Sequence, residues 1–216
     1  MASKEEIHEF GSCPLRSQRD YGERTARKGT LFDNGIESIL KRLATFRYGC
    51  VYTDGTCLTD MAKIDETDGR DIWIQSPREF WNRGIGMCHD ASVLLDAVLR
   101  VKGIGHRCCY IYSDEPPLYP THSFIIMPSI DGKFRILDVF SVDGCVYHES
   151  FQSYNKASEW RFERWLETDN GGSRNATILF GDAMPSPKCS FSVFSRNILD
   201  KFKQQKEIKQ QKEIKQ

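Results

Sequence analysis

The sequence predicts an α+β domain in which one apolar helix packs against an antiparallel sheet. Two patterns lead to this expectation. From Cys88 to Gly103, apolar residues recur at the three- and four-residue spacing of one helix face. Three runs rich in aromatic and β-branched residues then follow, separated by Pro, Asp and Gly. A chain of 216 residues is long enough to bury one sizeable core, so we expect a single main domain.

That domain is expected to span residues 31–196, with a different region at each end. Residues 1–30 contain "RSQRDYGERTARKGT", which is basic and nearly devoid of apolar residues, and are expected to form a mobile arm. We favour a solvated lead-in for this arm over a contact with an acidic partner. Residues 197–216 repeat the unit "KQQKEI" and predict a helical tail that is too polar to bury anything.

The composition argues against several classes of partner. Lysine and arginine total 30, as do aspartate and glutamate, so the chain lacks the basic balance of a nucleic-acid-binding protein. No segment approaches the roughly 18 apolar residues of a membrane span. The N-terminus, "MASKEEIHEFGSC", lacks the apolar run of a secretory signal, so we expect a cytoplasmic protein, and a viral or phage origin is equally compatible. Oligomeric state is left open.

The sequence predicts neither a metal nor a cofactor. None of the eight cysteines forms the C-x-x-C pairs of a zinc site, and a reducing compartment would keep them as thiols. The acidic run "DETDGRD" at residues 65–71 lacks the distal glutamate of a calcium-binding EF-hand loop. We therefore expect this run to be solvated surface.

Two helices are predicted before Cys88. Apolar residues at helical spacing between residues 36 and 43 predict the first, with Asp33 or Asn34 as its N-cap and its end at Gly49. Residues 50–72 predict a loop with at most short strands. The second helix is predicted by "SPRE" at residues 76–79, which combines a serine cap, a proline at the first helical position and a glutamate three residues after the cap.

The strands are predicted after the helix that begins at Cys88. The three runs are "HRCCYIYS", "THSFIIMP" and "KFRILDVF", at residues 106–113, 121–128 and 133–140. A further helix is expected at residues 158–167, and "ATILF" and "SFSVF" are expected to add edge strands at residues 176–180 and 190–194.

The position of Cys88 suggests chemistry. A cysteine at a helix N-terminus lies near unpaired backbone N–H groups and the positive end of the helix dipole, and both favour the thiolate. A nucleophilic thiolate also needs a base, and the base needs a group that orients it. His122 lies in the second predicted strand and Asp138 in the third. These residues predict a Cys-His-Asp triad.

The turn between these two strands decides whether His122 and Asp138 meet. A two-residue turn at Asp131 and Gly132 would put them on opposite faces of the sheet, because side chains alternate along a strand. A five-residue loop at residues 128–132 would set them directly opposite each other, and it would place Pro128 where no ladder hydrogen bond is needed. We predict this loop or an equivalent bulge.

Other candidate residues are interpreted as structural. His89 is expected to point away from Cys88, because adjacent residues on a helix do not face each other. Asp90 is expected to interact with the helix dipole. Cys108 and Cys109 alternate across a strand, and one or both are expected in the core. The two remaining histidines of the domain, His106 and His148, show no partner pattern and are assigned no role.

Three segments together resemble the core of the transglutaminase-like superfamily, whose members are papain-like thiol enzymes. They are "RGIGMCHDASVLLDAVLRVKGI", "THSFIIM" and "GKFRILDVF", and with the preceding "IQSPREFWNRG" they look most like the bacterial transglutaminase-like cysteine proteases. The resemblance covers about residues 35–142. It implies a papain-like fold with Cys88, His122 and Asp138 as catalytic residues.

The resemblance also implies further details of the site. The backbone N–H of Cys88 is the natural first oxyanion donor, and Gln75 or Trp73 is the expected second donor. This sequence departs from the family pattern beside the cysteine, where Met87 and His89 replace the usual acidic residues, which argues against a calcium site. After His122, Ser123 and Phe124 stand where a small residue and tryptophan are usual.

The expected function is a thiol-dependent hydrolase of amide bonds, acting as a protease, peptidase or deamidase on a protein or peptide through a thioester acyl-enzyme. We favour hydrolysis because the chain shows no sign of the extra domains of the large animal crosslinking enzymes. The alternatives are a protein-glutamine acyltransferase (a transglutaminase) and a non-catalytic member of the fold that binds a peptide or protein. A small binding module that works through the basic arm is a further rival.

Overall fold

The structure is a computed structural model that describes residues 35–59, 71–113, 121–129, 131–141, 144–146, 150–168 and 175–213. The basic arm at residues 1–30, the two expected caps Asp33 and Asn34, nearly all of the acidic run at residues 65–71 and His148 lie outside these residues. Within them, no helix has the length and apolar character needed to cross a bilayer.

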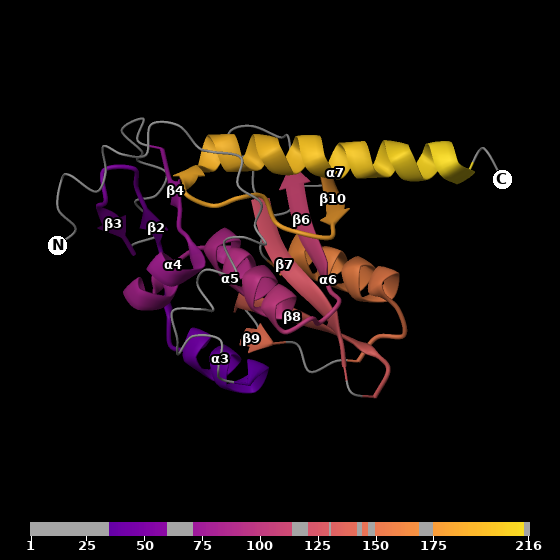
Figure 1. The fold of residues 1–216 in the computed structure, drawn as a ribbon, viewed down its shortest axis with the longest axis horizontal. Helices are drawn as coiled ribbons and strands as arrows, with labels where there is room; N and C mark the ends of the chain where they lie inside the picture. Colours follow the sequence, from indigo (N-terminus) through magenta and orange to yellow (C-terminus); the bar gives the residue numbers. More distant parts are fainter. Residues whose placement is uncertain are drawn as a thin grey trace.

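One five-stranded antiparallel sheet forms the centre of the fold (Figure 1). Its strand order is β10-β6-β7-β8-β9. The three predicted strands are confirmed as its middle, and "ATILF" is confirmed as an edge strand. The bounds are β6 Arg107–Ser113, β7 Thr121–Pro128, β8 Phe134–Ser141, β9 Gly144–Val146 and β10 Ala176–Gly181.

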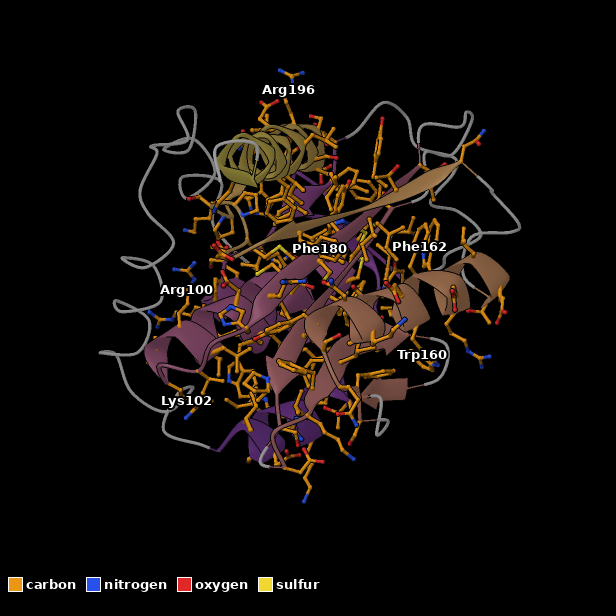
Figure 2. The ribbon with its side chains drawn as sticks, turned by 90° about the vertical axis from the view of Figure 1, so that its right-hand side faces the viewer. Arg100, Lys102, Trp160, Phe162, Phe180 and Arg196 are labelled. Atoms are coloured by element: carbon orange, nitrogen blue, oxygen red, sulfur yellow. The ribbon has the colours of Figure 1, made fainter. Side chains whose placement is uncertain are left out.

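Helices cover both faces of this sheet. The helix α5 (Cys88–Val101) packs on one face, where Ile125 and Leu137 join its apolar residues in the largest core cluster. The helix α6 (Tyr154–Thr168) packs on the other face, where Phe124 and Ile136 join its residues in a second cluster. This alternation follows from the two-residue period of a strand. Figure 2 shows α6, with Trp160 and Phe162 labelled, on the opposite side of the sheet from the C-terminal helix α7 (Phe191–Glu213). The domain is therefore α+β, as the sequence predicts.

Short elements connect this core to the start of α5. The helix α4 (Pro77–Arg83) precedes α5, and the predicted capping box is confirmed: Ser76 N–H donates to Glu79 Oε2 over 2.8 Å, and Glu79 N–H donates to Ser76 Oγ over 3.3 Å. Three short strand pairs surround it. They are β1 (Arg47–Tyr48) with β5 (Ile85–Gly86), β2 (Cys50–Val51) with β3 (Cys57–Leu58), and β4 (Trp73–Ile74) with β11 (Cys189–Ser190).

The first helix differs from its prediction at both ends. The helix α3 (Ile36–Leu43) has Gly35 as its N-cap, and it ends six residues before Gly49. The backbone N–H of Phe46 bonds to the Leu43 carbonyl in a tight turn, after which β1 pairs with β5. The chain must leave the helix early so that this pairing can form.

The hairpin between β7 and β8 has a different register from the predicted one. Five residues separate the strands, but they are residues 129–133, and Ile126 faces Ile136. Continued along the strands, this register places Asp138 opposite Phe124, on the same strand face as His122 but two residues away from it. The turn uses Gly132 at φ 75°, a left-handed conformation that favours glycine.

Pro128 belongs to β7 and not to the loop, which explains the shift in register. Its partner Phe134 directs both its N–H and its C=O to Phe151, at 2.8 and 2.9 Å. Phe134 therefore has no backbone group left to hydrogen bond with Pro128. The N–H that proline lacks is not needed at this position.

The C-terminal expectations are wrong in two respects. The segment "SFSVF" is not an edge strand, because only Cys189–Ser190 pairs and the helix α7 (Phe191–Glu213) begins at the next residue. The first turns of the predicted polar tail are also buried: Ile198 and Phe202 belong to the main core cluster. A side chain at Gly181 would overlap the Phe202 ring, so this glycine lets α7 approach β10 closely.

Candidate active site

The chain reaches Cys88 through a tightly packed glycine. At Gly86, an added Cβ would lie 2.7 Å from the Phe80 ring and 2.8 Å from Asp90 Oδ2. The next residue, Met87, has an extended backbone and acts as the N-cap of α5. Cys88 is thereby the first residue of the helix, where a backbone N–H has no helical carbonyl to bond.

Asp90 fixes this first turn, as the structural interpretation expects. It is buried, its Oδ2 accepts the Met87 N–H over 2.9 Å, and its Oδ1 accepts the Gln75 N–H over 2.7 Å. Burial raises the pKa of Asp90 to about 6, against the lowering effect of these two hydrogen bonds. The carboxylate therefore ties the segment after β4 to the start of α5.

The structure brings Cys88, His122 and Asp138 together. Their exposed fractions are 3%, 7% and 1%, respectively. His122 Nε2 lies 2.6 Å from Asp138 Oδ2, and the His122 ring is near enough to the Cys88 thiol for each group to shift the pKa of the other. Because Asp138 contacts Nε2, Nδ1 is the ring nitrogen left to exchange a proton with another group. Cys88 comes from α5, and the other two residues come from neighbouring strands of the sheet.

The electrostatics of this group favour a thiolate and an imidazolium. Burial by itself would raise the pKa of Cys88, but the neighbouring imidazoles of His89 and His122 lower it overall. Burial would likewise depress the pKa of His122, but Asp138 and the Cys88 thiolate raise it to about 10. The pKa of Asp138 is lowered, because His122 and Arg161 outweigh its burial.

Arg161 of α6 completes the group, and sequence reasoning did not find it. Its side chain is fully buried, its Nε donates to Asp138 Oδ2 over 2.7 Å, and its Nη2 lies 3.1 Å from His122 Nε2. A signal was present in the sequence. Arg161 lies midway between Ala157 and Trp165 at four-residue spacing, so it interrupts the buried stripe of its helix.

The expectation for His89 is wrong. Its side chain is 1% exposed, and its Nδ1 lies 3.4 Å from Cys88 Sγ. Helical side chains tilt toward the N-terminus of the helix, so the imidazole of the second residue can reach back to the sulfur of the first. Two imidazoles, those of His89 and His122, therefore act on the same thiol.

Tyr48 and Cys50 lie near enough to Cys88 for its charge to raise their pKa values. Tyr48 packs edge-on against Phe140 with ring centroids 5.2 Å apart, and Cys50 Sγ lies 3.3 Å from Met87 Sδ. Burial and then the negative charge of Cys88 raise the pKa of Tyr48. Burial, followed by Asp90 and Cys88, raises the pKa of Cys50 to about 12. Both groups therefore stay protonated while Cys88 ionises.

The two expected oxyanion donors lie near the start of α5. Gln75 is fully buried, and its Nε2 donates to the Ile85 carbonyl over 2.9 Å, which leaves one hydrogen of that amide for another acceptor. Trp73 lies in β4 and pairs with Ser190. Their role as oxyanion donors stays a prediction.

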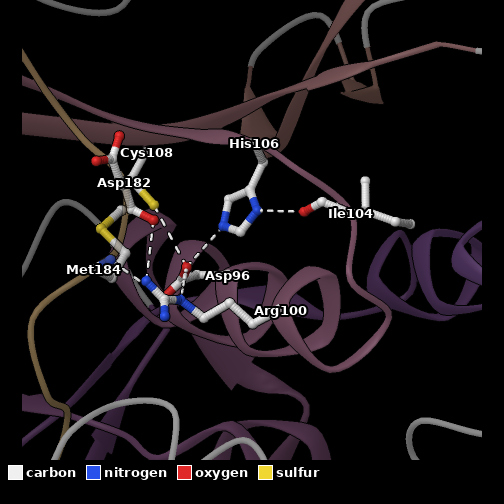
Figure 3. A network of polar contacts seen from close by, with 7 residues as sticks. All are labelled: Asp96, Arg100, Ile104, His106, Cys108, Asp182 and Met184. Atoms are coloured by element: carbon white, nitrogen blue, oxygen red, sulfur yellow. Dashed lines mark hydrogen bonds and ion pairs between the residues drawn. The ribbon is translucent and has the colours of Figure 1, made fainter.

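A second Asp-His-Cys group lies away from these residues (Figure 3). His106 Nε2 lies 2.7 Å from Asp96 Oδ1, and Cys108 Sγ lies 3.7 Å from the same oxygen. His106, to which the sequence assigned no partner, thus has one. The three ligand atoms lie within 4.8 Å of one another, close enough to hold a metal. However, Arg100 Nε already donates to Asp96 Oδ1 over 2.9 Å, and a cation there disfavours a metal.

The second group is also a poor nucleophile. Burial, and then the negative charge of Asp96, raise the pKa of Cys108 well above its ordinary range. Asp96 also accepts the Met184 N–H over 3.2 Å, so its carboxylate is fully occupied in joining α5, β6 and the segment after β10. This arrangement fits a structural network.

Comparisons of the chain with protein-family models and with curated proteins find no match.

Proposed function

We propose that this protein is a thiol-dependent hydrolase that cleaves amide bonds of a protein or peptide through a Cys88-His122-Asp138 triad, in a papain-like domain of transglutaminase-like type. The observation that carries the proposal is the geometry around one thiol: Cys88 begins α5, its Sγ lies 3.4 Å from His89 Nδ1, and Asp138 holds the His122 ring over 2.6 Å. The pKa of Cys88 is lowered, whereas the pKa values of the buried thiols Cys50 and Cys108 are raised. Structural cysteines need no such activation.

In the first step, Cys88 Sγ attacks the carbonyl carbon of the amide and forms a carbon–sulfur bond. His122 then donates its Nδ1 proton to the leaving nitrogen as the carbon–nitrogen bond breaks. The amine departs, and the acyl group stays on Cys88 as a thioester. The backbone N–H of Cys88, at the start of α5, is placed to stabilise the negative oxygen between these events.

In the second step, His122 acts as a base. It takes a proton from water, which attacks the thioester, and the Cys88 thiolate leaves. Asp138 holds the imidazole through Nε2 and stabilises its positive charge, as the carboxylate of a catalytic triad does. Arg161 in turn holds Asp138 from the α6 side of the sheet.

The acyl acceptor and the class of amide can be read from the products. We expect wild-type protein, incubated with reduced, unfolded casein, to release new peptide termini or to convert glutamine to glutamate. With a primary amine added, amine adducts on glutamine would instead identify a transglutaminase. Peptide mass spectrometry distinguishes these three products.

Two variants provide the controls for this experiment. Cys88→Ala is expected to abolish all products, because it removes the nucleophile. Cys57→Ala, which removes an exposed thiol, is expected to leave them unchanged. Products that persist in Cys88→Ala would contradict the proposal. A peptide bound with no product formed would favour the non-catalytic alternative.

A further inference from the structure

We propose that His89 is a positioning residue that donates a permanent Nδ1–H hydrogen bond to the Cys88 thiolate, an inference that rests on the proposed function. Its Nδ1 lies 3.4 Å from Cys88 Sγ. The thiolate would then have two imidazole donors with different tasks: His122 moves protons, and His89 keeps the sulfur ionised and in place.

The position of the proton on His89 follows from its partners. Nε2 of His89 is buried and has no hydrogen-bond partner among the described residues. A proton on Nε2, in either the neutral or the charged ring, would bury an N–H without an acceptor, which is costly. A proton on Nδ1 alone is paired with the ionised sulfur and leaves only the acceptor side of Nε2 without a partner, so no buried N–H is unpaired.

Aromatic rings hold His89 in this orientation. Its ring centroid lies 5.7 Å from that of Tyr110 on β6, and 5.0 and 6.0 Å from those of Phe191 and Phe194 on α7. These apolar contacts fix the ring without offering its nitrogens a proton acceptor. The first turn of α7, about 100 residues after His89 in the sequence, thus helps to hold the His89 ring.

His122 and His89 differ in whether a carboxylate contacts the ring and strengthens it as a base. Asp138 accepts from His122 Nε2 and favours a positive charge on that ring. No carboxylate contacts a ring nitrogen of His89 in the part of the chain that the structure describes. A general base gains strength from such a carboxylate, so His122 is the base and His89 is the fixed donor.

Other titratable groups face the thiol and are common to the wild type and the variants below. Tyr48 and Cys50 face it from β1 and β2, and Tyr110 from β6. Asp90 lies in the same helix turn, and Asp138 lies behind His122. Since none of them is altered, a change in the ionisation of Cys88 can be assigned to His89.

The test is the pH profile of iodoacetamide alkylation at Cys88 in His89→Leu and His89→Asn. Leucine removes the donor, whereas the asparagine amide nitrogen takes the place of Nδ1 and can still donate. Losing one hydrogen bond to a charged group is expected to raise the midpoint of the Cys88 profile by roughly one to two pH units in His89→Leu. His89→Asn is expected to restore most of this shift. Cys57, which is exposed, serves as the internal reference.

Three results would overturn the inference. The first is a His89→Leu midpoint equal to that of the wild type, and the second is an equal shift in both variants. The third needs no variant: ¹⁵N-histidine NMR of the wild type reports which nitrogen of His89 carries the proton, and an Nε2–H form would make His89 an acceptor. If the wild-type Cys88 itself alkylates no faster than Cys57 below pH 7, the proposed function fails first, so the two failures are distinguishable.

Discussion

At the scale of single residues, the surroundings of two buried cysteines, Cys88 and Cys108, shift their pKa values in opposite directions. Cys88 begins a helix and contacts two imidazoles, so its pKa is lowered despite complete burial. Cys108 lies in mid-strand beside an aspartate, so its pKa is raised. Both are close to a histidine and a carboxylate. The sign and position of the nearest charge, and not the residue types alone, decide which thiol can react.

Arg161→Met tests how Asp138 is held. The variant leaves a buried carboxylate without its cation, which is expected to lower the free energy of unfolding by about 3 kcal/mol at pH 7, measured by urea denaturation. A depressed carboxyl pKa gives stability that is present above the ordinary value of 3.8 and lost as pH falls through the folded value. With Arg161 absent, the folded pKa of Asp138 rises, so acid unfolding should begin at higher pH.

Arg164→Met is the matched control for this prediction. Arg164 lies one turn along the same helix, is partly exposed, and its Nη1 lies 3.9 Å from Glu167 Oε2. Its loss is expected to change stability by less than about 0.5 kcal/mol. Equal effects of the two substitutions would mean that Arg161 contributes nothing specific to Asp138.

The sequence predicted the three residues of the proposed triad, which the structure brings together, but it did not predict the residues that surround them. Cys88, His122 and Asp138 each lie in an element with a clear local pattern, and the order of these elements suggested their use. Arg161 and His89 were missed for different reasons. Arg161 comes from a helix that packs on the far face of the sheet, and no local pattern gives that contact. The prediction for His89 used only the direction of its side chain on the helix. It did not consider that an imidazole is long enough to contact the side chain of the preceding residue.

At the scale of elements, the entry into α5 depends on close packing at one glycine. Gly86→Ala is expected to lower the free energy of unfolding by about 1–3 kcal/mol, because its methyl group would overlap Phe80 and Asp90 Oδ2. It should also slow Cys88 alkylation, since Asp90 holds the turn that presents the thiol. Denaturation and alkylation rates measure the two effects.

Gly105→Ala is the matched control for this second substitution. Gly105 has open space where a Cβ would stand and no positive φ, so the added methyl group should change stability by less than about 0.5 kcal/mol. If Gly86→Ala is as mild as this control, the entry segment is looser than the packing indicates.

The hairpin shows why element boundaries were predicted less well than element types. The strand patterns at residues 121–128 and 133–140 were clear, but the register depends on the turn and on neighbours outside the hairpin. Phe151 takes both backbone hydrogen bonds of Phe134, which lets Pro128 stay in β7. This contact joins residues 17 positions apart in sequence, and no period in either strand reveals it.

At the scale of the whole molecule, the candidate site joins the three layers of the fold. Cys88 comes from α5 on one face, His122 and Asp138 from the sheet, and Arg161 from α6 on the other face. The α+β class and most elements could be predicted, because they follow from local periodicity. The packing of α6 on the second face of the sheet and the burial of Ile198 and Phe202 depend on contacts between residues far apart in the sequence. The composition therefore suggested a polar tail, whereas the first turns of this tail belong to the core.

The measurement that tests the central claim most directly is pH-dependent iodoacetamide labelling of the folded protein, quantified for each cysteine by peptide mass spectrometry, with His122→Ala alongside. The thiolate–imidazolium pair should exist from the lowered pKa of Cys88 up to about pH 10, where His122 loses its proton. The account therefore predicts that Cys88, though buried, labels faster than the exposed Cys57 below pH 7 and loses this advantage in His122→Ala. Labelling of Cys88 that is no faster than that of Cys57, or that is unchanged in His122→Ala, would contradict it.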